Sequence, residues 1–124
     1  MIETDSAFIS KIDEDTLKVI FKPNAFLTIK EYDTLYDHYR SVLGKDDGMK
    51  LMTIVQPGFR LEKQYSSFFT KNYRTDFKKA EAYILLHPPS RVFFKVGLKL
   101  IKGKHLARMF NNEEEALSWL KTIK

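Results

Sequence analysis

Few side chains in this sequence stand at spacings that support catalysis. The three histidines, His38, His87 and His105, fall on separate expected elements, without the His-x-x-x-His or histidine–acid spacing of a metal site. Asp33 and Asp37 are one helical turn apart, but such carboxylates are usually solvated rather than paired as an acid and a base. The sequence has no cysteine, no G-x-S-x-G nucleophile elbow and no glycine-rich phosphate loop. We therefore expect no catalytic residues, no metal site and no cofactor.

Positive charge is concentrated in one quarter of the chain. The formal net charge is +5, and residues 82–112 contain no acid but six basic residues: Arg91, Lys95, Lys99, Lys102, Lys104 and Arg108. A localised positive surface attracts nucleic acid, anionic lipid or an acidic partner, although a solvated helix face is the simpler interpretation. Aromatic residues could stack on nucleic acid, but most fall at core-facing helix positions, which disfavours that partner.

Four of these basic residues, Arg91, Lys95, Lys99 and Lys102, lie on a predicted helix from about Ser90 to Lys102, whose apolar face is unusually wide. Its basic side chains fall within about 80° of one another on a helical wheel, so apolar residues occupy about 240°. A surface helix needs an apolar stripe only somewhat over about 100° wide. Either neighbouring elements cover both flanks, or one flank meets a partner subunit or the acyl part of a lipid. The candidate contact residues are Arg91, Phe94, Lys95, Leu98, Lys99, Ile101 and Lys102.

Hydrophobic periodicity predicts the elements that position these residues in a single domain over residues 1–124. Alternating or continuous apolar runs predict five strands, Phe8–Ile12, Leu17–Phe21, Leu51–Val55, Ala80–Leu86 and Leu106–Phe110. Helical periods predict four helices: one capped by Thr28 and ended by Gly44, one with apolar positions from Leu61 to Tyr73, the 90–102 helix, and one capped by Asn112. The order β-β-α-β-α-β-α-β-α predicts an α/β fold with a mixed, mostly parallel five-stranded sheet.

The predicted strand Leu51–Val55 is the centre of this arrangement. It lacks apolar–polar alternation, which is typical of a parallel strand covered on both faces. Function in open α/β sheets tends to lie where such strands end, which points to the loop Gln56–Leu61. No apolar run approaches the roughly 18 residues of a membrane span, and the acidic N-terminus lacks a signal-peptide core, so we expect a cytoplasmic protein.

The element order and the C-terminal residues resemble the SpoIIAA-like superfamily, which includes STAS domains and is structurally akin to CRAL-TRIO lipid carriers. The residues that carry the likeness are Arg91-Val-Phe-Phe-Lys-Val-Gly, Met109-Phe110-Asn111-Asn112-Glu113-Glu114-Glu115-Ala116-Leu117 and Trp119-Leu120. In uncharacterised bacterial SpoIIAA-like proteins, a strand ending in Phe likewise leads into an acidic-capped helix ending in Trp-Leu. The resemblance implies a SpoIIAA/STAS-like fold and a binding or regulatory module rather than a catalyst.

The resemblance does not extend to the phosphorylation switch of STAS domains. Anti-sigma antagonists of this type are phosphorylated on a serine at the start of the helix after the central strand. The corresponding stretch here, Gln56-Pro57-Gly58-Phe59-Arg60-Leu61, contains no Ser or Thr. What remains at this loop is a predicted docking surface of Gln56, Phe59 and Arg60.

Two functions follow from these observations. The first is a non-enzymatic STAS-like domain that regulates by binding another protein, with a homodimer through the 90–102 helix as one arrangement. The alternative is a binder or carrier of an anionic lipid or other amphipathic ligand, held by the basic rim and apolar interior of the same helix.

Overall fold

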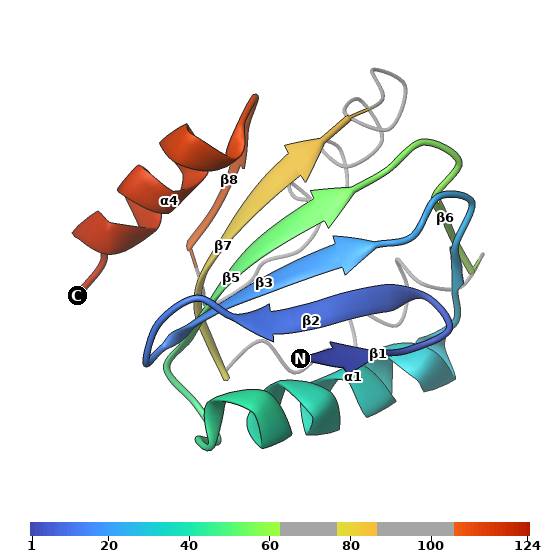
Figure 1. The fold of residues 1–124 in the computed structure, drawn as a ribbon, viewed down its shortest axis with the longest axis horizontal. Helices are drawn as coiled ribbons and strands as arrows, with labels where there is room; N and C mark the ends of the chain where they lie inside the picture. The colour runs from blue at the N-terminus through green and yellow to red at the C-terminus, as the bar shows by residue number, and fades with distance from the viewer. Residues whose placement is uncertain (63–76, 87–105) are drawn as a thin grey trace.

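Strand β5 (Met49–Val55) lies at the centre of the main sheet, and all seven of its residues are buried. The computed structural model describes residues 1–62, 77–86 and 106–124. Their main sheet has the order β1-β2-β3-β5-β7-β8 (Figure 1). Its other strands are β1 (Ile2–Glu3), β2 (Ala7–Lys11), β3 (Thr16–Phe21), β7 (Lys78–Leu85) and β8 (Leu106–Phe110).

Strand directions confirm the predicted mixed sheet. β1, β2 and β3 pair antiparallel in sequence order, whereas the pairs β3–β5, β5–β7 and β7–β8 are parallel. The prediction of five strands was wrong, because Ile2–Glu3 adds a sixth strand at the edge. Two residues are too short a run for a period-two pattern, and only their pairing with Phe8 and Ile9 defines the strand.

Two of the four predicted helices lie in the described residues. They are α1 (Ile29–Leu43) and α4 (Glu113–Thr122). The other two predicted helices fall mainly on residues 63–76 and 87–105, outside the described residues. Leu61, which we expected in the second helix, instead belongs to a strand, β6 (Arg60–Leu61).

Side-chain caps fix both helix starts. The hydroxyl of Thr28 accepts a hydrogen bond from the Glu31 amide at 3.1 Å, and Asn112 Oδ1 accepts one from the Glu115 amide at 2.8 Å. At α1 the carboxylate of Glu31 accepts a hydrogen bond from the hydroxyl of Ser6, which ties the helix to the turn before β2. Gly44 ends α1 in the left-handed conformation, with φ of 72°.

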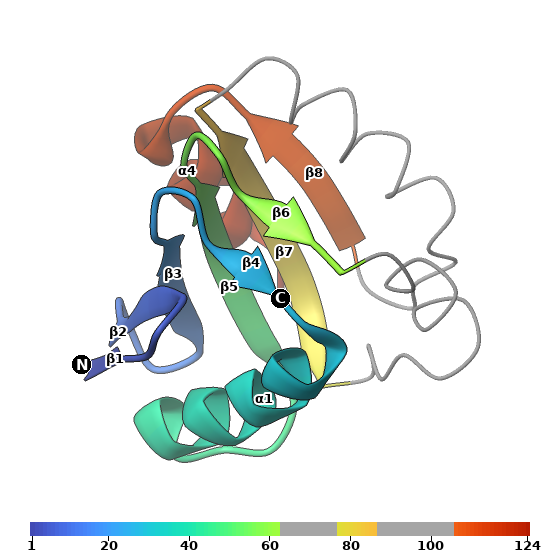
Figure 2. The ribbon, with the colours of Figure 1, turned by 90° about the vertical axis from the view of Figure 1, so that its right-hand side faces the viewer.

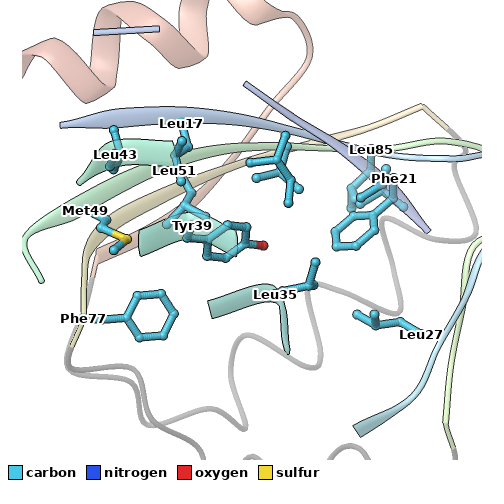
Figure 3. Close-up of a cluster of buried hydrophobic side chains, with 14 residues drawn as sticks. Leu17, Phe21, Leu27, Leu35, Tyr39, Leu43, Met49, Leu51, Phe77 and Leu85 are labelled. Carbon is cyan, nitrogen blue, oxygen red and sulfur yellow. The ribbon is translucent and has the colours of Figure 1, made fainter. Parts of the chain in front are cut away.

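The two helices cover opposite faces of the sheet, which explains why β5 is buried on both (Figure 2). On one face, Leu35, Tyr39 and Leu43 of α1 pack against side chains that include Leu51 and Leu85 (Figure 3). On the other face, α4 packs against the neighbouring side chains of β5 and β7, chiefly through Ala116 and Leu120. Alternate residues of β5 therefore serve two different cores.

Candidate functional site

A second, two-stranded sheet lies at the carboxyl end of β3 and β5. Strand β4 (Phe26–Leu27) follows β3, and strand β6 follows β5. Because β3 and β5 are parallel, both connecting segments leave the main sheet at the carboxyl ends of its strands (Figures 1 and 2). The two strands are parallel, with Phe26 opposite Arg60. We call residues 24–27 and 56–61 the β4–β6 ledge. It occupies the edge of an α/β sheet where binding sites tend to lie.

Backbone hydrogen bonds hold the ledge in one conformation. The Asn24 amide donates to the Pro57 carbonyl at 3.0 Å, the Arg60 amide to the Ala25 carbonyl at 2.8 Å, and the Glu62 amide to the Leu27 carbonyl at 3.1 Å. Isolated two-stranded sheets are marginal in water, so these bonds and the core beneath must stabilise it. The ledge is therefore a structured part of the fold rather than a free loop.

Side chains of the ledge divide into an inner and an outer set. Leu27 is 2% exposed, and the partly buried ring of Phe59 packs on Phe21 with centroids 4.8 Å apart. Phe26 is 45% exposed, and the exposed Arg60 places its guanidinium carbon 5.4 Å from the centre of the Phe26 ring. The outer surface therefore includes a guanidinium that lies over an open aromatic ring.

The three residues of the predicted docking surface all lie on the ledge, in different environments. Arg60 is exposed, Gln56 is half-buried, and Phe59 packs against the core of the α1 face. Sequence reasoning missed Phe26, which lies between the predicted strand Leu17–Phe21 and the helix capped by Thr28. The signal was present: Phe26 and Leu27 are consecutive, so in an extended segment one of them must point away from the core.

Arg60 has no acidic partner among the residues that the structure describes. The ion pairs in that part of the chain involve Lys18, Lys22, Arg40, Lys50 and Lys78. Arg40 provides a direct comparison, because its guanidinium also stacks on a ring, 5.1 Å from Tyr36, yet it pairs with Asp37 and Asp46. Arg60 thus retains hydrogen-bonding capacity that Arg40 has already used.

A buried polar cluster lies on the α1 face of the sheet, centred on the carboxylate of Glu81. It accepts hydrogen bonds from Lys78 Nζ at 2.8 Å, the Thr53 hydroxyl at 2.8 Å and the Tyr83 hydroxyl at 2.7 Å. Lys78 and Glu81 are only 5% and 4% exposed. Sequence reasoning had placed Glu81 in a buried strand without assigning it a partner.

A register shift explains how Lys78 and Glu81 meet. Residues three apart on a regular strand point to opposite faces. Here Met49 pairs with Lys78 whereas Lys50 pairs with Ala80, so the strand is irregular at Lys79 and both charged side chains reach the α1 face. The register and the buried ion pair therefore depend on each other.

Burial also perturbs Tyr39 of α1, which is close to this cluster. Desolvation of the phenolate raises the pKa of Tyr39 strongly, against the opposing field of Lys78 and with a further contribution from Glu81. Tyr39 therefore stays protonated in the folded protein at neutral pH. Because the Glu81 carboxylate is already hydrogen-bonded and inaccessible, the cluster has the character of a structural network.

Several predicted residues fall outside the described part of the chain. They include all the contact residues predicted on the 90–102 helix, Arg91, Phe94, Lys95, Leu98, Lys99, Ile101 and Lys102, as well as His87 and His105. In the described segments, no group of three His, Cys, Asp or Glu side chains could hold a metal ion. Those segments also contain no helix that is long and apolar enough to cross a membrane.

The protein is an α/β domain with a mixed sheet, and its fold is similar to the SpoIIAA-like fold. It is similar to the crystal structure of an uncharacterised protein of the DUF3478 family from Shewanella loihica PV-4, which has a SpoIIAA-like fold. The TM-score is 0.58 at 16% sequence identity, and the likeness covers 97% of this chain and 98% of that one. The chain itself belongs to the family described as Domain of unknown function (DUF7793), whose model matches residues 10–124. No protein of curated function matches the chain.

Proposed function

We propose that this protein is a non-catalytic regulatory module of the STAS-like type, which acts by binding another protein through the β4–β6 ledge. The observation that supports this function best is the pairing of Arg60 with the exposed ring of Phe26. Both groups stand on a hydrogen-bonded frame at the carboxyl edge of the sheet, where α/β folds bind their ligands. Exposed Arg and aromatic side chains are enriched at the centres of protein interfaces.

Regulation by phosphorylation at the ledge is not part of the proposal. Residues 56–61 contain no Ser or Thr, and Arg60 and Leu61 form a strand. A partner would therefore bind the ledge without prior phosphorylation of residues 56–61.

The buried Glu81 cluster does not offer a general acid or base. The Glu81 carboxylate already accepts three hydrogen bonds, from Lys78, Thr53 and Tyr83. A general acid or base has to reach the proton that it transfers, directly or through one water. A carboxylate that is 4% exposed and occupied in this way does not meet that requirement.

The alternative function, binding of an anionic lipid or other amphipathic ligand, stays a prediction from the sequence. It depends on residues 91–102, as does the proposed homodimer, and these lie outside the described residues. Lipid extraction from the natively purified protein tests the ligand directly, and sedimentation tests the dimer.

Site-specific photo-crosslinking in the native host tests the proposal. A photoreactive residue replaces Pro57, which is exposed on the ledge, and in a control strain it replaces Glu14, which is exposed in the turn between β2 and β3. We expect discrete protein adducts from position 57 that are absent from position 14. No adduct at position 57, or the same adducts at both positions, would overturn the proposed function.

A further inference from the structure

We propose that Arg60 and Phe26 together recognise an aspartate or glutamate that stands beside an apolar side chain on the partner protein. This inference rests on the proposed function and names the chemistry of the partner at the same site. The carboxylate would accept hydrogen bonds from the guanidinium of Arg60, and the apolar side chain would cover the ring of Phe26.

The geometry of the pair suits a carboxylate. A guanidinium that lies over an aromatic ring keeps its N–H groups in its own plane, where they can donate two parallel hydrogen bonds to one carboxylate. The Arg60 guanidinium carbon is 5.4 Å from the Phe26 ring centre, and in the described residues no carboxylate occupies its N–H edge. Stacking also restricts the arginine, so less conformational entropy is lost on binding.

The apolar half of the recognition comes from Phe26. Its side chain is 45% exposed although its neighbour Leu27 is buried, because consecutive residues of β4 point in opposite directions. An exposed ring beside a guanidinium favours a partner that combines an acid with an apolar group over a simple anion. Covering the ring also removes water from around the ion pair, which strengthens it.

Neighbouring charges favour a protein over a membrane surface. Anionic membranes are typically bound by clusters of about four to eight basic residues. Arg60 is the one basic residue among residues 24–27 and 56–61 of the ledge. The nearby Lys22 is paired with Glu3 at 2.8 Å, and the acidic Glu62 directly follows β6, so the ledge carries no cluster of positive charge. One preorganised guanidinium matches one carboxylate better than it matches a charged sheet of headgroups.

Two other arginines also lie over aromatic rings but differ from Arg60 in their surroundings. Arg40 lies over Tyr36 but is already paired with Asp37 and Asp46. Arg108 lies 5.4 Å from the ring of Phe110, but that ring packs on Trp119 with centroids 5.5 Å apart and belongs to the α4 core. Among the residues that the structure describes, Arg60 combines a guanidinium that has no acidic partner with an open ring.

A displayed random-peptide library, selected on the full-length protein, tests the inference. The affinities of the peptides that bind the wild type are then measured for Arg60→Gln, Arg60→Lys, Phe26→Ser and the control Arg40→Gln. We expect the enriched peptides to share an acid next to an apolar residue. Affinity should fall at least about tenfold for Arg60→Gln and for peptides with the acid changed to its amide, less for Arg60→Lys, and not for Arg40→Gln.

The outcomes separate the possible failures. Enriched peptides without an acid, binding that survives Arg60→Gln, or no enrichment at all would overturn the inference. Vesicles of phosphatidylglycerol that bind the wild type and lose binding with Arg60→Gln would also overturn it, in favour of a membrane. If crosslinks from position 57 persist with Arg60→Gln, the ledge docks a protein by other chemistry: the proposed function stands and this inference fails.

Discussion

The side-chain oxygen of Asn24 fills the space beside Gly58 that any larger residue would need. A Cβ on Gly58 would lie 2.0 Å from Asn24 Oδ1 and 3.1 Å from Asn24 Cα. Both residues have positive φ, 62° at Asn24 and 83° at Gly58, a region that Asn and Gly adopt most readily. This close approach lies beside the pairing of Phe26 with Arg60, so a larger residue at position 58 would displace Asn24 at the start of the ledge.

Replacing Gly58 should therefore disturb the ledge as well as strain the backbone. Gly44 is the matched control, because it also has positive φ but has no atom within 4 Å of an added Cβ. Gly44→Ala should lower the free energy of unfolding by roughly 1–2 kcal/mol, the cost of left-handed backbone. Gly58→Ala should cost about 1 kcal/mol more, because of the added overlap. Denaturant unfolding measures both, and equal losses would show that the Asn24 contact is unimportant.

Breaking the buried ion pair should be costly. Lys78→Met leaves the carboxylate of Glu81 buried without its cation, so the free energy of unfolding should fall by about 3 kcal/mol. The exposed neighbour Lys79 is the control, and Lys79→Met should change stability by less than about 0.5 kcal/mol.

The pairing of the two charges can be isolated by a second substitution. Adding Glu81→Gln to Lys78→Met removes the uncompensated charge but keeps an acceptor for Thr53 and Tyr83, so it should restore at least about 1 kcal/mol. Urea unfolding of the wild type, Lys78→Met, Glu81→Gln and the double variant gives this coupling. A further loss of stability on adding Glu81→Gln would contradict the claim that Lys78 stabilises the fold by neutralising the buried charge of Glu81.

The stability of the protein should depend on Tyr39 at high pH. An unfolded tyrosine ionises near pH ~10, but burial raises the pKa of Tyr39 above that value in the folded state. The unfolded state therefore releases its proton first, and stability that is fully present below about pH 10 is lost as pH rises further. From about pH 8 to about pH 11, wild type should lose more free energy of unfolding than Tyr39→Phe. Parallel losses in the two proteins would exclude this effect.

The outward residues of the ledge should contribute little to stability. Arg60→Gln should change the free energy of unfolding by less than about 0.5 kcal/mol, and Phe26→Ser, which removes a partly covered ring, should lower it by about 1 kcal/mol. Replacing the inward neighbour Leu27, which is 2% exposed, by alanine should lower the free energy of unfolding by about 2–4 kcal/mol. Thermal unfolding distinguishes the two sets. A large loss at Phe26 would mean that its ring serves the fold rather than a partner.

Long apolar and well-capped segments could be predicted from the sequence. The strand Leu51–Val55 and the caps at Thr28 and Asn112 follow from local patterns, and the structure confirms them. The edge strand Ile2–Glu3 could not be predicted, because pairing with a neighbour defines so short a strand.

The candidate site was only partly predictable for the same physical reason. The loop after the central strand pointed to Arg60, but its stacking on Phe26 depends on parallel pairing between residues more than thirty positions apart. Lys78 and Glu81 likewise meet through a register shift that no periodicity reveals. Contacts of this kind are set by the packing of the whole sheet.

The most direct test of a docking ledge is the crosslinking yield from position 57 in three backgrounds: wild type, Arg60→Gln and Arg40→Gln. Both arginines are exposed and stack on an aromatic ring, so the comparison holds charge and stacking constant. We expect a yield about tenfold lower with Arg60→Gln and an unchanged yield with Arg40→Gln. An unchanged yield with Arg60→Gln, or an equal fall in both variants, would contradict recognition of a partner by Arg60 on the ledge.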